Sequence, residues 1–308
     1  MAYLIKMLWN YTTGKDENKM KTSKKAVIMA GLMSAAMLLG GCKAEEKTPV
    51  ILAVSFGTSY DDNREATIGA VENAIKTANP DYEVRRAFTS QIVIDVVKER
   101  GTAVIDNVEE AFDKLVKDGV KKLVVQPTHV INGYEYDDLI AAVEQYKGKF
   151  DSVSVGAPLL SSDSDYTAVA DIIVEDTAAF NTDGTAIVFM GHGTEHAANA
   201  SYGKLQETLK AKGADNYFIG TVESSPTLDD VVAAVKAGGY KKVVLQPLMV
   251  VAGDHANNDM AGDEEDSWKS TFEAEGLEVE CSLKGLGSIK AIQDIYVAHT
   301  AEAVKGLK

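Results

Sequence analysis

Residues 121–135 read KKLVVQPTHVINGYE, and residues 241–255 read KKVVLQPLMVVAGDH. The two stretches share a Gln-Pro pair at the same place and a glycine six residues after the proline. In each, a short apolar run leads into a more polar loop, which is the pattern of a buried strand followed by a loop. At the last position Glu135 in the first copy corresponds to His255 in the second. The sequence therefore predicts two related halves that present different chemical groups to one ligand.

Apolar runs and amphipathic stretches alternate on both sides of this repeat. We expect strands at 50–56, 82–88, 123–126, 153–157, 186–190, 217–222, 243–246 and 277–283. Helical spacing follows the strands, and one such stretch contains Val104, Val108, Ala111, Phe112 and Leu115. Strands that alternate with helices predict parallel sheets of the α/β class, with the loops that follow the strands at one edge of each sheet. Four strands fall in each half, so we divide the chain into an α/β half at 50–183 and a second at 184–308.

Candidate chemistry lies in the loops that follow the strands, because ligands bind beyond the carboxyl ends of parallel strands. His192 stands between two glycines directly after an apolar strand, so its ring is left uncovered. His255 is a second imidazole that can ligate a metal ion, and Glu135 is a base or ligand for the same cleft. Each also has a purely structural alternative: a helix cap for His192, a surface loop for His255 and an acid at a helix start for Glu135.

The same converging loops supply candidate residues for binding a substrate. They are Ser55, Gly57, Thr58, His129, Gly191 and Gly193. His129 follows a strand end and has packing in the core as its alternative role. Neither the GxGxxG pattern nor a Walker lysine follows the first strand, so we expect no nucleotide.

Composition limits the partners. The chain of 308 residues has a formal net charge of -15, which argues against a nucleic-acid surface. The same charge is unfavourable for an anionic substrate, which needs local positive groups.

The amino terminus has the layout of a targeting segment. Lys21, Lys24 and Lys25 precede the apolar run 26–41, which ends in Leu-Gly-Gly-Cys at 39–42. That ending resembles a bacterial lipobox, which would make Cys42 the lipidated first residue of an exported, membrane-anchored protein. We therefore expect a signal peptide at 1–42 and a tether at 43–49. An uncleaved membrane anchor is the alternative, although the run is shorter than a typical bilayer span.

Several longer motifs resemble one family, the anaerobic sirohydrochlorin cobaltochelatases of the CbiK type. The motifs are VSFGTS at 54–59, RAFTS at 86–90, INGYEY at 131–136, MGHG at 190–193 and PLMVVAGDHANNDM at 247–260. The resemblance implies two Rossmann-like halves, related by internal duplication, that face a central tetrapyrrole cleft. It implies insertion of Co2+ into sirohydrochlorin for cobalamin synthesis. It also implies that His192, His255 and Glu135 are the metal-binding residues, with His192 and Glu135 catalytic.

Some consequences of the resemblance stay open. Ligand type does not separate Co2+ from Fe2+ or Ni2+, and the proton acceptor is either Glu135 or His192 itself. Arg64, Arg85 and Arg86 are candidates to neutralise the carboxylates of the tetrapyrrole. The rival function is a lipid-anchored binding protein for a metal, haem or corrinoid, and a homo-oligomer is compatible with either function.

Overall fold

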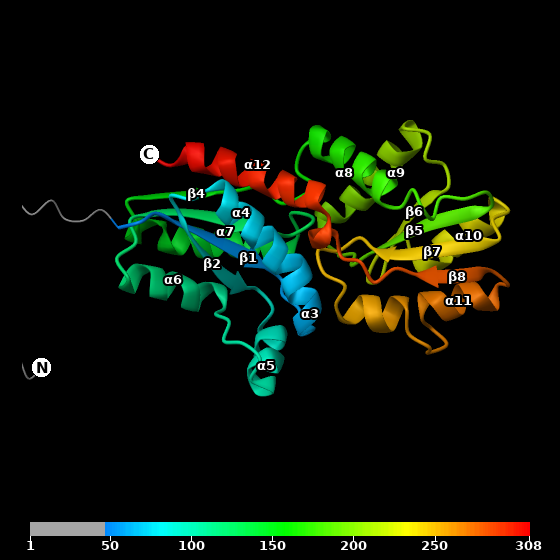
Figure 1. Cartoon of the computed structure of the whole chain (residues 1–308), viewed down its shortest axis with the longest axis horizontal. Coiled ribbons are helices and arrows are strands. Elements are labelled where there is room, and N and C mark those ends of the chain that lie inside the picture. Colours follow the sequence, from blue (N-terminus) through cyan, green and yellow to red (C-terminus); the bar gives the residue numbers. More distant parts are fainter. Residues whose placement is uncertain (1–46) are drawn as a thin grey trace, which may run out of the picture. The chain divides into compact units, whose positions relative to one another are not determined.

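Eight strands form two separate sheets in the computed structural model, which describes residues 47–308 (Figure 1). The first half contains β1 (Val50–Ser55), α3 (Asp61–Arg64), α4 (Ala70–Ala78), β2 (Glu83–Phe88), α5 (Gln91–Arg100), α6 (Val108–Lys117), β3 (Lys122–Pro127), α7 (Tyr134–Tyr146), β4 (Ser152–Val155) and α8 (Asp163–Asp176). The second half contains β5 (Thr185–Gly191), α9 (Ala200–Ala211), β6 (Tyr217–Thr221), α10 (Leu228–Ala237), β7 (Lys242–Pro247), α11 (Trp268–Ala274), β8 (Glu278–Cys281) and α12 (Lys290–Gly306).

Both sheets are parallel and have the same strand order. The first runs β2-β1-β3-β4 and the second β6-β5-β7-β8. The registers also agree, since Val54 pairs with Pro127 in the first sheet and Met190 pairs with Pro247 in the second. In each sheet the second strand lies on one side of the first strand and the third strand lies on its other side. The chain therefore changes direction across the sheet at the first strand, and α/β proteins bind ligands at such a switch point. The predicted fold class and duplication are confirmed.

All eight predicted strands are present, but one helical prediction is wrong at its start. Helix α6 begins at Val108, because Asn107 accepts a hydrogen bond from the Glu110 amide and closes a capping box. Val104 lies before this cap and is 93% exposed. Helix α5 was not predicted, because its apolar residues do not form one clear stripe.

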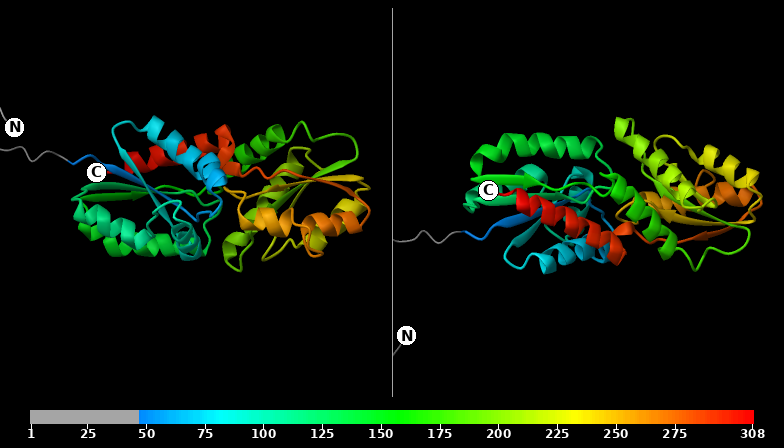
Figure 2. Two further views of the ribbon diagram at one scale, coloured as in Figure 1. Left: turned by 60° about the horizontal axis from the view of Figure 1, so that its bottom comes forward. Right: turned by 90° about the horizontal axis from the view of Figure 1, so that it is seen from above.

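The two halves exchange their last helices (Figure 2). Helix α8 follows the first sheet in sequence, yet its Val169 and Ile173 belong to the same buried cluster as Ile187 and Phe189 of β5. Helix α12 ends the second half and packs on α4 and on β3 of the first half. The division at 183/184 therefore separates the sheets but not the helices that cover them.

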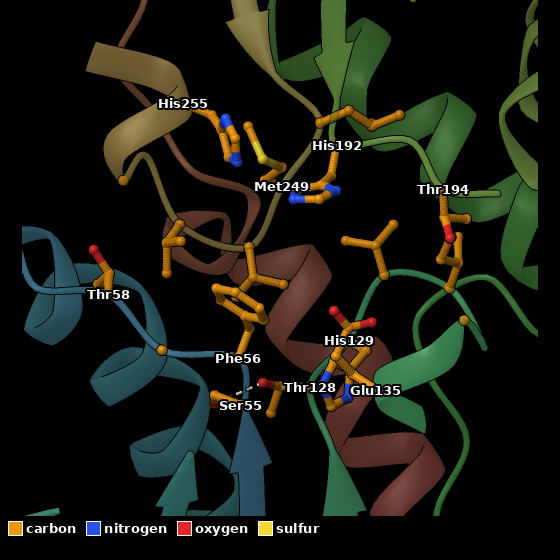
Figure 3. A pocket seen from close by; sticks show the side chains of 18 of the residues that line it. Ser55, Phe56, Thr58, Thr128, His129, Glu135, His192, Thr194, Met249 and His255 are labelled. Carbon is orange, nitrogen blue, oxygen red and sulfur yellow. Dashed lines mark hydrogen bonds between the residues drawn. The ribbon is translucent and has the colours of Figure 1, made fainter. Parts of the chain in front are cut away.

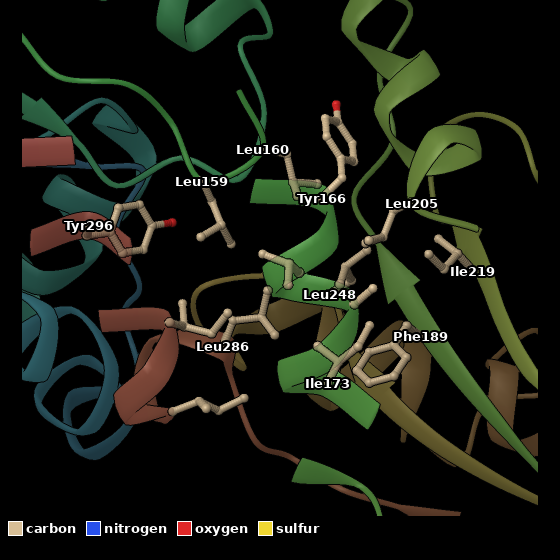
Figure 4. Packing of buried hydrophobic residues seen from close by; sticks show 14 of the residues in the cluster. Leu159, Leu160, Tyr166, Ile173, Phe189, Leu205, Ile219, Leu248, Leu286 and Tyr296 are labelled. Atoms are coloured by element: carbon tan, nitrogen blue, oxygen red, sulfur yellow. The ribbon is translucent and has the colours of Figure 1, made fainter. Parts of the chain in front are cut away.

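One apolar core joins the halves, and each half has a second core of its own. The shared cluster contains Val124 from β3 and Val244 from β7, together with residues of α8, α9 and α12. Figure 4 shows Ile173 of this cluster beside Phe189, with Leu286 and Tyr296 nearer the first half. Because both sheets bury one face in the shared cluster, their relative orientation is fixed by packing.

Within residues 47–308 the structure contains no helix that is both long and apolar enough to span a bilayer. The expected signal segment and Cys42 lie outside the described residues, as does the first part of the expected tether.

Candidate active site

A cavity of about 560 Å³ lies between the two halves, where the loops after β1, β3, β5, β6 and β7 meet. Its walls are largely apolar, with Phe56 and Ile131 from the first half and Met249, Val250 and Val251 from the second. This size falls within the range of pockets that hold organic ligands. The predicted central cleft is therefore present at the predicted edge of both sheets.

Three side chains of the second half could hold a metal ion. One ligand atom from each of His192, Glu223 and His255 lies within 4.8 Å of the others, and among the described residues this is the group with that property. The two imidazole rings are perpendicular, with centroids 4.8 Å apart. Two imidazoles and one carboxylate suit a divalent transition metal.

Backbone geometry places two of these groups. His192 directly follows β5, and the left-handed backbone of Gly193 (φ 85°) turns the chain away after it. The backbone N–H of Glu223 donates to the carbonyl of His192 at 2.8 Å, so the ends of β5 and β6 stay side by side. The duplicated loops alone did not point to Glu223, because the second strand end of each half has no repeated motif.

Both imidazoles have one ring nitrogen already engaged. His192 Nδ1 lies 2.9 Å from the Gly193 carbonyl, and His255 Nδ1 lies 2.6 Å from Oδ2 of Asp259. When Nδ1 donates its proton in these contacts, Nε2 is left unprotonated and can bind a metal. A carboxylate behind the ring, as at His255, also fixes the ring orientation.

Glu135 lines the same cavity from the first turn of α7, but it lies outside the ion group. Figure 3 shows Glu135 beside His129 on one side of the cavity, opposite His192, Met249 and His255. The structure thus brings His192 and His255 together as expected, with Glu223 rather than Glu135 as the nearby carboxylate. Because Glu135 lines the cavity, it can still accept protons although it is not an ion ligand.

The internal duplication explains why the two sides differ. The Ser90 amide donates to the Phe56 carbonyl just as the Glu223 amide donates to that of His192. Equivalent positions across the cavity are Phe56 and His192, Ser90 and Glu223, His129 and Met249, and Glu135 and His255. The ion ligands are therefore confined to the second half, whereas the first half presents an aromatic ring, an imidazole and a carboxylate.

His129 is the most unusual group in the first half. Neither of its ring nitrogens has a hydrogen-bond partner, and both are shielded from solvent. Burial lowers the pKa of His129 to about 4, an effect that the charge of Glu135 partly opposes. The imidazole is therefore neutral at physiological pH.

Of the other predicted substrate-binding residues, Ser55, Gly57, Thr58 and Gly193 line the cavity. The hydroxyls of Ser55 and Thr128 are hydrogen-bonded to each other at 2.7 Å. Gly57 has a left-handed backbone (φ 107°) and a Cβ there would overlap the ring of Phe88.

Gly191 ends β5 behind the cavity instead of lining it. A Cβ on Gly191 would lie 2.3 Å from the ring of Tyr202. Its lack of a side chain therefore lets α9 pack against β5 just behind His192.

The three arginines considered from sequence do not reach the cavity. Arg64 is buried against Asp61, Arg85 pairs with Glu83 and Asp118, and Arg86 pairs with Glu72. The cavity walls contain four acidic residues and, within the described part of the chain, no lysine or arginine. The acids are Glu135, Glu195, Glu223 and Asp254.

Comparison with known proteins agrees with this geometry. The model of the family described as "Cobalt chelatase (CbiK)" matches residues 49–305. The sirohydrochlorin cobaltochelatase of Salmonella typhimurium is 38% identical over 254 residues, which cover 82% of this chain and 96% of that protein. Sirohydrochlorin cobaltochelatase CbiKC of Nitratidesulfovibrio vulgaris is 35% identical over 279 residues, covering 87% and 96%.

A solved structure supports the fold alone. SirB from Bacillus subtilis with Fe3+ has a TM-score of 0.58 at 14% identity, and the match covers 83% of this chain and 96% of that one. The family model and both curated relatives place the chain in the class of metal chelatases. Within that class, the chain belongs to the CbiK cobalt chelatase family.

Proposed function

We propose that this protein inserts Co2+ into sirohydrochlorin, in the synthesis of cobalamin, without ATP. The observation that carries the proposal is the group His192, Glu223 and His255 on one wall of an apolar cavity. Such a cavity accommodates a flat macrocycle, and the group presents a divalent ion to one of its faces. The curated relatives named sirohydrochlorin cobaltochelatase supply the identity of the macrocycle.

The reaction exchanges two protons for one ion. Co2+ binds first to the two imidazoles and the carboxylate, with water completing its coordination. As the four ring nitrogens of the macrocycle replace these ligands, the two pyrrole N–H bonds break and their protons leave. Glu135, on the wall opposite the ion group, is the base that we assign to accept the two protons one after the other and pass each to solvent, because His192 is occupied by the ion.

The test uses a soluble form beginning at Lys47 and follows the absorbance of sirohydrochlorin after Co2+ is added. His192→Ala and Glu223→Ala should each lower the insertion rate at least tenfold, and Glu135→Gln should lower kcat more than it raises KM. His196→Ala is the matched control, because that histidine contacts Asp137 and lies outside the ion group. Wild-type rates in both His192→Ala and Glu223→Ala would refute the ion site, and tight binding without turnover would favour the binding-protein alternative.

The amino-terminal motif supports an exported, lipid-anchored form, which we include in the proposal. The wild-type chain should take up labelled palmitate and fractionate with membranes, whereas Cys42→Ser should do neither. Membrane retention of the Cys42→Ser chain without label would instead indicate an uncleaved anchor. Homo-oligomerisation stays a prediction, which light scattering on the soluble form would check.

A further inference from the structure

The substrate of the proposed function carries carboxylates around its ring, and the cavity that would receive it is acidic. Four acids line the walls with no lysine or arginine among the described lining residues. Like charges repel strongly where water is excluded. The substrate carboxylates must therefore avoid the interior and meet positive charge at the mouth of the cavity.

Arg100 is the arginine placed to supply that charge. The chain has four arginines, all within the described residues, and the other three each have a carboxylate within 4 Å. Arg100 has no such partner among residues 47–308. It is solvent-exposed, so its charge is available to a ligand.

The position of Arg100 links it to the cavity. It is the last residue of α5, and one guanidinium N–H donates to the backbone carbonyl of Ser59 at 2.8 Å. Ser59 itself lines the cavity. The carboxylate of Asp61 feels the charge of Arg100, but it is paired with Arg64 at 2.7 Å and forms no ion pair with Arg100.

We propose that Arg100 binds a peripheral carboxylate of the tetrapyrrole at the mouth of the cavity and thereby selects for acidic macrocycles. A guanidinium can hold a carboxylate through two parallel hydrogen bonds, which Lys cannot reproduce. The hydrogen bond to Ser59 ties the guanidinium to a loop that lines the cavity before the ligand arrives. This inference rests on the proposed function for the identity of the ligand class.

The experiment measures the Kd of metal-free sirohydrochlorin by fluorescence titration, for the soluble form with Arg100 intact, Arg100→Ala and Arg100→Lys. Arg100→Ala should weaken binding about tenfold at low salt, and the difference should shrink to about twofold at high salt because the contact is exposed. Arg100→Lys should fall between the two. Arg85→Ala is the matched control with an unchanged Kd, since that guanidinium is held by Glu83 and Asp118.

A fully methyl-esterified tetrapyrrole separates charge recognition from a structural role. Arg100→Ala should bind the ester as well as the wild type does. An equal loss for acid and ester, or a loss for the acid below twofold, would overturn the proposal. The binding titrations contain no metal, so their outcome does not depend on insertion. If the wild type binds the macrocycle but does not insert Co2+ in the absorbance assay, the proposed function is refuted and this inference stands.

Discussion

At the scale of single residues, the site depends on groups behind the ion ligands as much as on the ligands themselves. Asp259 Oδ2 lies 2.6 Å from Nδ1 of the His255 ring, and the Gly193 carbonyl lies 2.9 Å from Nδ1 of His192. When Nδ1 donates its proton in these contacts, Nε2 is left unprotonated and free to bind a metal. His129 has no such contact on either nitrogen, which sets it apart from the two imidazoles of the ion group.

Replacing Asp259 tests its contact with Nδ1 of His255. Asp259→Asn should lower the affinity for Co2+ by about 10- to 100-fold, because the His255 ring loses the group that orients it. Isothermal titration with Co2+ measures this, and Asp263→Asn is the control, since Asp263 pairs with Lys269 outside the ion group. An unchanged affinity in Asp259→Asn would show that packing alone orients the ring.

His129, whose ring nitrogens are shielded from solvent, should make the protein less stable in mild acid. Its pKa of about 4 in the folded protein lies below the usual 6.5, so between these values the unfolded chain binds a proton that the folded chain does not. Stability is therefore lost as the pH falls from 6.5 toward 4, by about 2 kcal/mol at a pH of about 5. His129→Phe should remove that part of the loss in urea unfolding at about pH 7 and about pH 5. The same pH dependence in both proteins would contradict the prediction.

At the scale of elements, the sharp turn after β5 aims His192. Gly193 has a left-handed backbone, and a Cβ there would lie 2.8 Å from the Ser224 amide and from Thr221 Cβ. A substitution must therefore move the loops that carry His192 and Glu223. The glycine is required both for its conformation and for the space around it.

Two alanine substitutions separate the need for a left-handed backbone from the need for space around the glycine. Gly193→Ala should lower the insertion rate more than tenfold, because it displaces the ion ligands. Gly213→Ala is the matched control: Gly213 is also left-handed (φ 77°) but has open space around it. It should cost about 1 kcal/mol of unfolding free energy with an unchanged insertion rate. Equal rates in the two variants would show that the turn does not position His192.

At the scale of the whole molecule, the exchanged helices make the halves depend on each other. Helix α12 comes from the end of the chain, and its Tyr296 hydroxyl donates to the Thr128 carbonyl, directly before His129. Helix α8 makes the reverse connection to the second sheet. Neither sheet can bury both faces without a helix from the other half.

Residues 47–308 should therefore unfold in one step. In the soluble form Trp268 is the single tryptophan, and it is buried against the second sheet, so its fluorescence reports that half alone. Circular dichroism reports the helices of both halves. The two urea transitions should coincide, because loss of either half exposes the shared core. Separate midpoints would show that the halves unfold independently.

The sequence by itself determined the strands, their parallel arrangement in two copies, the cleft at their carboxyl ends and the pairing of His192 with His255. These follow from periodicity and from a repeat with constant spacing, which act along the chain. Only the tertiary structure decided that Glu223 joins the imidazoles, that Glu135 faces them from the other wall, and that Arg64, Arg85 and Arg86 are paired elsewhere. The start of α6 could have been read from its local capping box, Asn107 and Glu110, but the exchange of α8 and α12 was equally out of reach. Such contacts join segments far apart in sequence, and packing and charge pairing select them with no trace in local spacing.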